Sequence, residues 1–149
     1  LFKQRGTYLV PTLTAPTCIL EHLEDGTQPQ FVLDKARVVN EAMLVNIRRA
    51  YEAGVKIAGG SDAGTPFNFH ENYAYEVELM HTLLGMSPQR ALHAATAVAA
   101  ELIGLHRGIV AAGEPADLLA VAADAGADVR ALRDVRAVLK DGQIVHRAG

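Results

Sequence analysis

The chain has 149 residues and a formal net charge of −3; half of its residues are apolar and 21% are charged. This composition is typical of a globular protein and excludes a disordered chain, and no apolar run approaches the ~20 residues of a membrane span. Neither a membrane nor a nucleic acid is expected as a partner, and the single cysteine, Cys18, excludes an internal disulfide and fits a reducing, cytoplasmic compartment.

The first predicted elements are a helix end and a strand. Residues 3–6 (Lys-Gln-Arg-Gly) are typical of a helix carboxyl terminus, where cations complement the carbonyl end and glycine adopts the left-handed conformation. Residues 7–10 are β-prone and Pro11 ends regular pairing, which predicts a strand. Tyr8 and Thr12 are candidates to point into a pocket, although a strand tyrosine is more often a core or rim residue.

Residues 14–30 contain Pro16, Gly26 and Pro29 and show no periodicity, so a long loop is predicted there. Loops of this length in compact domains are often functional lids. His22 lies in this segment, but no second ligand at metal spacing is near it in the sequence. A solvent-exposed histidine is therefore favoured over a metal ligand.

An amphipathic helix is predicted from residue 31 to residue 53. Its apolar residues recur every three or four positions, with charged residues between them. The apolar set is Leu33, Ala36, Val39, Met43, Ile47 and Ala50. Gly54 ends this helix before the next strand, and the order strand, loop, helix, strand is the repeating unit of an α/β barrel.

The second predicted strand is the short apolar run 55–58. It is followed by Gly59-Gly60 and then by an acidic residue, Asp62. The run is too short for a confident helix and the glycines stop it, so a buried strand entering a loop is favoured. In α/β barrels and open α/β sheets, the chemistry lies at the carboxyl ends of the strands. The alternative is that Asp62 forms an Asx-turn and only organises its own loop.

A loop of mixed polar and aromatic residues, 64–72, follows Asp62 and is expected to cover the site. His70-Glu71 in this loop does not form a zincin motif, because position 74 is alanine. His70 is therefore a candidate for substrate contact, with a histidine that caps the next helix as the alternative.

Two further helical segments are predicted from periodicity and capping residues. The apolar stripe of the first is Tyr73, Val77, Met80 and Leu84. Gly85 ends that helix, and Ser87-Pro88 predicts an N-cap followed by proline at the first helical position of the second. The helical pattern continues to Gly104, with Thr96 as a candidate cap of a separate last turn.

From residue 107 the pattern changes to short β-like runs separated by glycine. Four strands are predicted, at residues 108–110, 117–121, 135–139 and 143–146. Asp141-Gly142, between the last two, is the strongest short signal for a β-hairpin.

Four motifs of this chain together resemble a known family. They are Gly60-Ser61-Asp62-Ala63-Gly64, Ser87-Pro88-Gln89-Arg90-Ala91-Leu92, Ala94-Ala95-Thr96 and Gly113-Glu114-Pro115-Ala116-Asp117-Leu118. In order and spacing, from about Gly6 to the end, this set resembles the C-terminal part of the metal-dependent amidohydrolase superfamily. Within that superfamily, the chain most resembles the imidazolonepropionase-like and Xaa-Pro dipeptidase-like members.

The resemblance implies an α/β fold, namely the C-terminal part of a (β/α)8 TIM-type barrel plus strands of a small β-sandwich. Residues 1–104 would be the last βα units, with residues 8–13 as the seventh barrel strand. Residues 105–149 would be sandwich strands that are incomplete without the N-terminal part. A complete barrel takes about 250 residues, so the chain is expected to be a fragment. Since the sequence begins at Leu1, a removed signal peptide upstream stays open.

The resemblance also implies the chemistry of the site. Such enzymes hold one or two divalent metals, usually Zn²⁺, on a His-x-His pair, a carboxylated lysine or glutamate, two further histidines and an aspartate on the eighth strand. Asp62 matches the last of these ligands and no other ligand has a match. It would bind the metal and move a proton from the metal-bound water to the leaving nitrogen. Asp62 is thus the catalytic and metal-ligating candidate, and His70 and Tyr8 are the substrate-binding candidates.

The predicted function of a full-length parent is metal-dependent hydrolysis of a C–N bond in a small amide or peptide, such as a dipeptide or an N-acyl amino acid. A homo-oligomer is the expected assembly of that parent. Two alternatives stay open: an imidazolonepropionase-like cyclic amidase and a non-catalytic structural fragment. A zinc site needs three or four protein ligands and Asp62 is one, so this chain alone is expected to be inactive and to hold no metal tightly.

Overall fold

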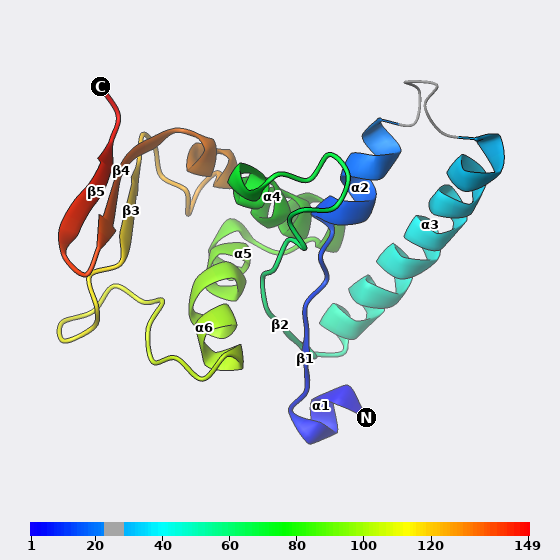
Figure 1. The fold of residues 1–149 in the computed structure, drawn as a ribbon. Helices are drawn as coiled ribbons and strands as arrows, with labels where there is room; N and C mark the ends of the chain where they lie inside the picture. The colour runs from blue at the N-terminus through cyan, green and yellow to red at the C-terminus, as the bar shows by residue number, and fades with distance from the viewer. Residues whose placement is uncertain (23–28) are drawn as a thin grey trace.

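The computed structural model describes residues 1–22 and 29–149, and Figure 1 shows a mixed fold of helices and short strands. The helices are α1 (Phe2–Arg5), α2 (Thr14–Glu21), α3 (Gln30–Glu52), α4 (Tyr73–Leu84), α5 (Pro88–His93) and α6 (Ala99–Leu102). Two 3-10 turns are η2 (His70–Asn72) and η4 (Val129–Arg133), and a π-helical segment is η3 (Ala94–Val98). The strands are β1 (Tyr8–Leu9), β2 (Lys56–Ile57), β3 (Leu118–Val121), β4 (Val135–Lys140) and β5 (Gln143–Arg147).

A short parallel pair, β1–β2, runs through the middle of the helices. Tyr8 is opposite Lys56 and Leu9 is opposite Ile57. The amide of Ala58 extends the pairing by donating to the carbonyl of Leu9 at 3.0 Å. The predicted strands 7–10 and 55–58 are therefore confirmed, and their carboxyl ends lie at the same edge of the pair.

The helices bury the core around this pair. Leu13, Met80 and Ala91 are fully buried, and Val77 and Ile57 are nearly so. These residues belong to one apolar cluster that also takes in the inner faces of α3 and α4. The core therefore lies between the helices and the parallel pair.

The predicted helix 31–53 is confirmed as α3, but its pattern is only partly the expected one. Leu33 and Ile47 are buried, whereas Val39, which was assigned to the inner face, is 55% exposed. Phe31 and Val38 on the outer side are exposed as well, so both sides of α3 carry apolar residues. Within residues 1–22 and 29–149, no helix combines the length and the apolar character that a bilayer span requires.

The prediction of a loop over residues 14–30 is wrong for its first half, because residues 14–21 form α2. Pro16 does not prevent this helix, since it lies in the first turn, where the backbone N–H has no intrahelical partner. The amides of Leu13 and Thr14 at the start of α2 are satisfied by the carboxylate of Glu76 from α4. That partner is 62 residues away in sequence from Thr14. Residues 23–28, which include Gly26, lie outside the described residues.

The helix boundaries set by local residues are confirmed. Gly85 ends α4 in the left-handed conformation, with φ of 70°. The Ser87 side chain accepts a hydrogen bond from the amide of Arg90 at 3.3 Å, as an N-cap does. The separate last turn capped by Thr96 is wrong, because α5, η3 and α6 form one continuous helix. The Thr96 hydroxyl donates back to the carbonyl of Leu92 at 2.8 Å instead of capping a new helix.

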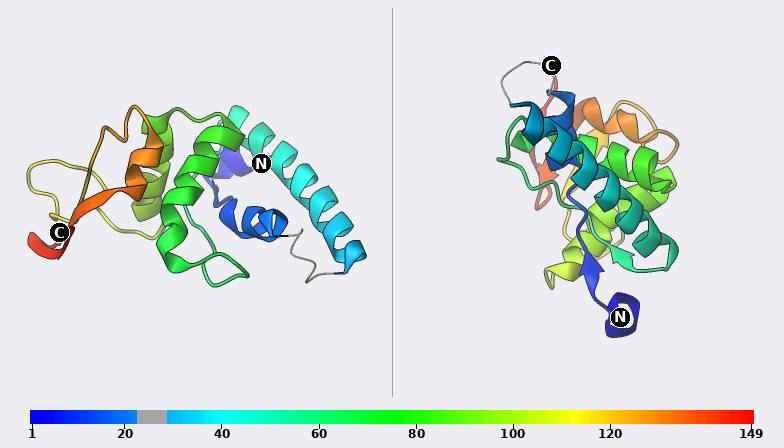
Figure 2. Two further views of the ribbon diagram at one scale, coloured as in Figure 1. Left: turned by 90° about the horizontal axis from the view of Figure 1, so that it is seen from above. Right: turned by 90° about the vertical axis from the view of Figure 1, so that its right-hand side faces the viewer.

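The antiparallel sheet β3–β4–β5 lies at one end of the molecule, and α3 lies at the opposite end (Figures 1 and 2). Asp141 and Gly142 join β4 to β5 with φ of 48° and 78°, as a two-residue hairpin turn of type I′ requires. The predicted strands at 117–121, 135–139 and 143–146 are confirmed, but residues 108–110 form a bend and not a strand. Gly108 there has φ of 90° and lies against the backbone of Thr96, which is incompatible with an extended chain.

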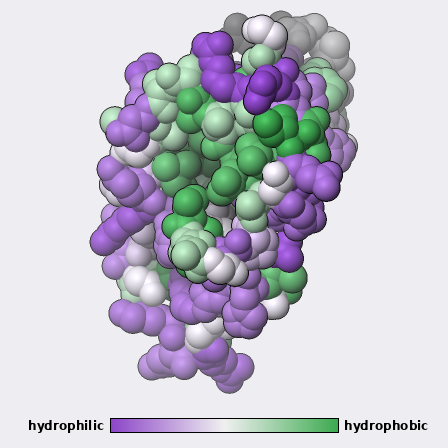
Figure 3. Space-filling view, turned by 90° about the vertical axis from the view of Figure 1, so that its left-hand side faces the viewer, coloured by the Kyte–Doolittle hydropathy of each residue, from purple (hydrophilic) through white to green (hydrophobic). Residues whose placement is uncertain are grey.

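The sheet contributes no residue to the buried apolar cluster among the described residues. All five residues of β5 are exposed. Leu119, Ile144 and Val145 are 49%, 52% and 61% exposed. Figure 3 views the molecule from the side of the sheet and shows a hollowed apolar area there, surrounded by polar residues.

Candidate functional site

The candidate site lies at the carboxyl edge of the parallel pair, where two loops begin. The first loop follows β1 and leads through Thr12 into α2, and the second follows β2 and contains Asp62. Because β1 and β2 are parallel and in register, both loops leave the pair at the same edge.

Two glycines allow β2 to enter its loop. A Cβ at Gly59 would lie 2.8 Å from the Cα of Ala95, and a Cβ at Gly60 would lie 2.6 Å from a methyl group of Val10. The amide of Gly59 also donates to the carbonyl of Ala94 at 2.8 Å. The end of β2 is thus held closely between β1 and the continuous helix α5–η3–α6.

Asp62 lies five residues beyond the end of β2, in a left-handed backbone conformation with φ of 53°. Such a conformation is uncommon for any residue other than glycine, and it persists only where the surroundings hold it. Its backbone carbonyl accepts hydrogen bonds from Thr65 Oγ1 and Asn68 Nδ2, each at 3.1 Å. The side chain is exposed, and within residues 1–22 and 29–149 its carboxylate makes no hydrogen bond or ion pair.

Asn68, and not the Asp62 carboxylate, organises this loop. The Asn68 side chain is 1% exposed, and its Nδ2 donates to the carbonyl of Ser61 at 2.7 Å and to that of Asp62. The Asn68 carbonyl accepts from the amide of Gly64 at 2.9 Å. The Asx-turn alternative for Asp62 therefore does not apply, because a second residue holds the loop and leaves the carboxylate free. Sequence reasoning missed Asn68, since no local motif marks an asparagine that bonds to carbonyls six and seven residues earlier.

Glu76 holds the neighbouring loop, and no local sequence motif predicts this role either. It is fully buried in α4, and its carboxylate accepts from the amides of Leu13 and Thr14 at 2.9 and 2.7 Å. The Thr14 hydroxyl donates to the same carboxylate at 2.7 Å. Burial raises the pKa of Glu76, and these hydrogen bonds oppose that rise. The residue before them, Thr12, is left-handed with φ of 45°.

Tyr8 lies at the other edge of the parallel pair from Asp62. It faces Lys56, the first residue of β2, whose ammonium lies 4.9 Å from the centre of the Tyr8 ring. Lys56 also forms an ion pair with Glu101 of α6 at 2.7 Å, and that hydrogen bond is the main cause that raises the pKa of Lys56. Tyr8 is thus engaged in a surface cluster, and its proposed contact with substrate stays a prediction.

The two loop histidines are placed differently. His70 is exposed at the start of η2, at the far end of the loop that contains Asp62. His22 ends α2 and stacks on Phe67 of the same Asp62-containing loop, with ring centres 4.1 Å apart and an angle of 2° between the planes. The expectation that His22 is a solvent-exposed loop residue is therefore wrong, because the stack half-buries it and connects the two loops.

The residues do not complete a metal site. Across residues 1–22 and 29–149, no three histidine, cysteine, aspartate or glutamate side chains converge where they could hold a metal ion. Asp62 is exposed, and its carboxylate has no partner in the described part of the chain, but one carboxylate is fewer than the three or four ligands that zinc requires. The described residues therefore supply Asp62 as one candidate ligand, and metal binding by the chain alone stays a question for experiment.

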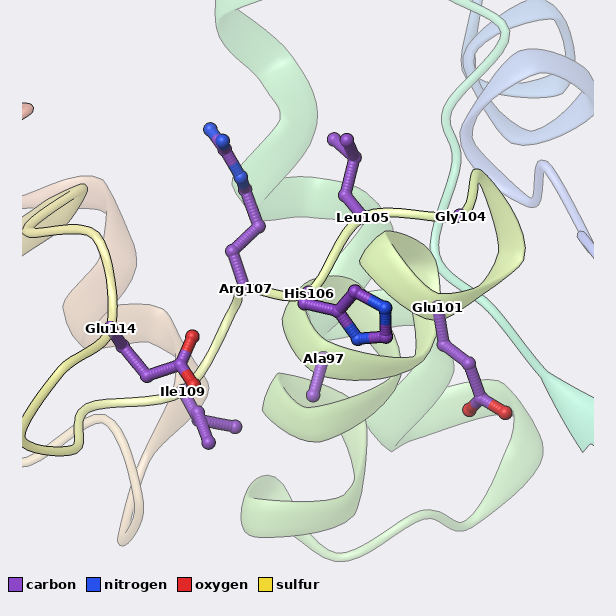
Figure 4. Close-up of a pocket in the computed structure, with 8 residues that line it drawn as sticks. All are labelled: Ala97, Glu101, Gly104, Leu105, His106, Arg107, Ile109 and Glu114. Atoms are coloured by element: carbon purple, nitrogen blue, oxygen red, sulfur yellow. The ribbon is translucent and has the colours of Figure 1, made fainter.

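Two clefts of the molecule are lined by residues other than Asp62. One, of about 580 Å³, lies between α2, α4 and β4, and the stacked rings of His22 and Phe67 form part of its wall. A smaller one, of about 280 Å³, lies beyond the end of α6 (Figure 4). There the His106 and Glu101 side chains are on one side of the chain, while Arg107 extends away and pairs with Asp117 at 3.2 Å. Neither cleft contains Asp62.

The chain is similar to known proteins over nearly its whole length. The family model described as "Amidohydrolase family" matches residues 1–145. A search of curated proteins found no match.

Among solved structures, the chain is similar to an Xaa-Pro dipeptidase with bound methionine in its active site, at 34% identity and a TM-score of 0.86, covering 99% of this chain and 36% of that one. A prolidase complexed with N-methylphosphonate-L-proline matches at 27% identity and a TM-score of 0.83, over 99% and 36% of the two chains. The ochratoxinase of A. niger matches at 25% identity and a TM-score of 0.82, over 99% and 34%. The chain thus spans about a third of the length of the solved structures that it matches.

Proposed function

This chain belongs to the amidohydrolase family, and from that premise we propose that it carries the aspartate-bearing strand of an enzyme that hydrolyses an amide or peptide C–N bond in a small substrate. The single observation that carries the proposal is Asp62. It is an exposed carboxylate just past the carboxyl end of a parallel strand, in a left-handed conformation supported by Asn68, and its oxygens make no hydrogen bond to the residues that the structure describes.

The loop geometry supports a chemical role for Asp62. A carboxylate that only stabilised its loop would accept hydrogen bonds from nearby amides, and here Asn68 and Thr65 do that work on the backbone instead. Non-glycine residues in this left-handed conformation persist only where the surroundings hold them, and such strained residues cluster at functional sites. The buried amide of Asn68 supplies that support.

In the proposed reaction, Asp62 accepts a proton from the water that attacks the amide carbonyl and passes it to the leaving nitrogen. A bound divalent metal, Zn²⁺ or another, would lower the pKa of that water to near neutrality and polarise the carbonyl. The described residues supply one candidate ligand for it, so the remaining ligands would come from parts of a full-length enzyme that this chain does not span. For the chain alone we expect neither turnover nor tightly held metal.

Within such an enzyme, residues 1–104 would be the last βα units of a barrel and residues 105–149 part of a small β-sandwich. The family relationship implies a fragment of a TIM-barrel-type fold. Leu119, Ile144 and Val145 of the antiparallel sheet are exposed, and they support the second half of this proposal because exposed apolar residues that lie together are often covered by another part of a protein.

The substrate class is proposed from two of the similar structures, which are an Xaa-Pro dipeptidase and a prolidase. We propose a dipeptide or an N-acyl amino acid, with His70, an exposed side chain at the far end of the Asp62 loop, as the candidate to contact it. Tyr8 is a weaker candidate because its hydroxyl accepts from Lys56 at 3.3 Å at the opposite edge of the pair.

The test is Asp62→Asn in the full-length enzyme. This change preserves the shape of the side chain but removes the basic carboxylate, so turnover of Xaa-Pro dipeptides and N-acyl amino acids should fall about 10²–10⁴-fold with KM little changed. Asp134→Asn is the matched control, because Asp134 is an exposed aspartate far along the chain from Asp62 that pairs with Arg136. Unchanged turnover in Asp62→Asn, or no metal-dependent hydrolysis by the wild-type enzyme across these substrates, would contradict the proposal.

A further inference from the structure

Glu76 is the most deeply buried charged side chain in the described part of the molecule, and it is aimed at the edge that carries Asp62. Its carboxylate oxygens accept three hydrogen bonds, from Leu13 N, Thr14 N and Thr14 Oγ1. Both Glu76 and Thr14 are fully buried, so water cannot replace either partner.

The three donors lie directly after the left-handed residue Thr12. Leu13 and Thr14 begin α2, and their amides are among those that a helix start leaves without intrahelical partners. A carboxylate is suited to this position because it is negatively charged and has acceptor sites for all three donors. The contact therefore fixes where the chain turns after β1.

The same turn of α4 also contacts the end of β2. The hydroxyl of Tyr73 donates to the carbonyl of Ala95 at 3.3 Å, and it lies where a Cβ on Gly59 would be. Tyr73 and Glu76 are three residues apart, and residues at this spacing lie on the same face of a helix. One rigid helical turn thus touches both loops of the candidate site.

We propose that Glu76 is a positioning residue for the reaction at Asp62. It holds the loop after β1 at a fixed place beside the Asp62 loop, and it acts through Thr12 and Leu13 without touching substrate. This inference rests on the function proposed above and adds to it a residue outside the reacting groups.

The test compares Glu76→Gln with Thr14→Val in the full-length enzyme. Glutamine keeps the size of the side chain but replaces one acceptor oxygen with an NH₂ group, which would face a backbone N–H. Valine at position 14 removes only the hydroxyl donor. We expect kcat to fall at least tenfold in Glu76→Gln and two- to fivefold in Thr14→Val, with KM changed less than threefold in both.

A second readout follows the loop itself. Amide hydrogen exchange at Leu13 and Thr14, measured by mass spectrometry, should become at least tenfold faster in Glu76→Gln. Glu78→Gln is the matched control on the same helix, because Glu78 pairs with Arg133 and does not touch the loop. It should leave both kcat and the exchange of Leu13 and Thr14 unchanged.

The outcomes separate the two proposals. If the wild-type enzyme hydrolyses none of the substrates, the proposed function fails. If the wild type is active but Glu76→Gln and Thr14→Val keep its kcat, or if exchange at Leu13 and Thr14 is unaffected, the role of Glu76 is overturned. If Glu76→Gln does not fold, Thr14→Val decides alone, because it removes one donor and keeps the carboxylate.

Discussion

The parallel pair β1–β2 and the antiparallel sheet β3–β4–β5 are stabilised by different kinds of contact. The strands of the pair are separated by a long helix, and they are held by groups distant in sequence, such as the carbonyl of Ala94 and the carboxylate of Glu76. The antiparallel sheet is joined by a two-residue turn and lies outside the buried cluster of the described residues. The pair therefore depends on the whole core, whereas the sheet depends mainly on its own turn and neighbours.

One glycine from each region illustrates this difference in what stabilises the two. Gly59 in the loop after β2 is required because the backbone of Ala95 and the hydroxyl of Tyr73 approach it closely. Gly142 in the hairpin is required because its φ is 78°, while the nearest atom to an added Cβ, on Ala116, would be at 3.9 Å. The first requirement is set by the fold around it and the second by the turn alone.

The largest effect is expected in the core that supports the pair. Met80→Ala removes a fully buried side chain and leaves a cavity, so the free energy of unfolding should fall by about 2–5 kcal/mol in urea titration. Val145→Ala, in the exposed strand β5, is the control and should change it by less than about 0.5 kcal/mol. Equal losses for the two variants would show that the sheet shares the core after all.

Gly59→Ala is expected to destabilise the molecule by about 1–3 kcal/mol, since the new methyl group would overlap the Cα of Ala95 and force the strand to move. The same urea titration measures the loss, and near-ultraviolet circular dichroism of the tyrosines would report the displacement of Tyr73. A variant as stable as the wild type would mean that β2 and the helix are not packed this closely.

Gly142→Ala is expected to cost roughly 1–2 kcal/mol, the usual penalty for a left-handed conformation in a residue with a Cβ. The loss should be confined to the hairpin, so amide exchange should quicken in β4 and β5 but not in α4. Gly149→Ala, at a glycine with open space around it, serves as the control. Faster exchange across the whole molecule would remove the distinction between the two regions.

The smallest effect is expected from Asp117, which connects the hairpin to the preceding segment. Its carboxylate accepts from Lys140 at 2.6 Å, from the amide of Asp141 at 2.9 Å and from Arg107 at 3.2 Å. The Lys140 hydrogen bond, followed by the others, lowers the pKa of Asp117 below its ordinary value.

Because the pKa of Asp117 is lower in the folded state, its stabilising contribution is present above the unfolded pKa of about 3.9 and is lost as the pH falls through the lowered folded value. Asp117→Asn should therefore flatten the fall of the melting temperature below about pH 4, and added salt should shrink the difference because the group is exposed. If the melting temperatures of variant and wild type fell equally with pH over this range, Asp117 would not contribute to the pH dependence of stability.

What could be predicted from the sequence follows the same division. Gly85, Ser87 and Asp141-Gly142 act on residues within a few positions of themselves, so their helix ends and hairpin turn were predicted correctly. Helix α2 was missed because the carboxylate that satisfies its first amides comes from Glu76, far along the chain. The strand before Asp62 was predicted correctly because a short apolar run before glycines is a local signal for a strand end, whereas the role of Asp62 stays a prediction.

The residues that hold the Asp62 loop could not be predicted from local sequence signals. Asn68 acts by being buried, and burial depends on packing that no motif encodes. Tyr8 was a candidate because it lies on a predicted strand, but its neighbours depend on how that strand pairs, and the pairing places it opposite Lys56. The antiparallel strands were recognised from turn residues, whereas the bend at Gly108 required knowing that the backbone of Thr96 is beside it.

The π-helical segment Ala94–Val98 has an evolutionary consequence. Its wide turn holds one residue more than an α-helical turn would, and the carbonyls of Ala94 and Ala95 in it accept from Gly59 N and Tyr73 Oη. Removing one residue would restore an ordinary α-helical turn, so the wide turn that presents these carbonyls to Gly59 and Tyr73 would be lost. In homologous sequences, small residues in this segment should therefore replace one another freely, whereas insertions and deletions should be rare. The length of the segment should thus be more strongly conserved than its residue types.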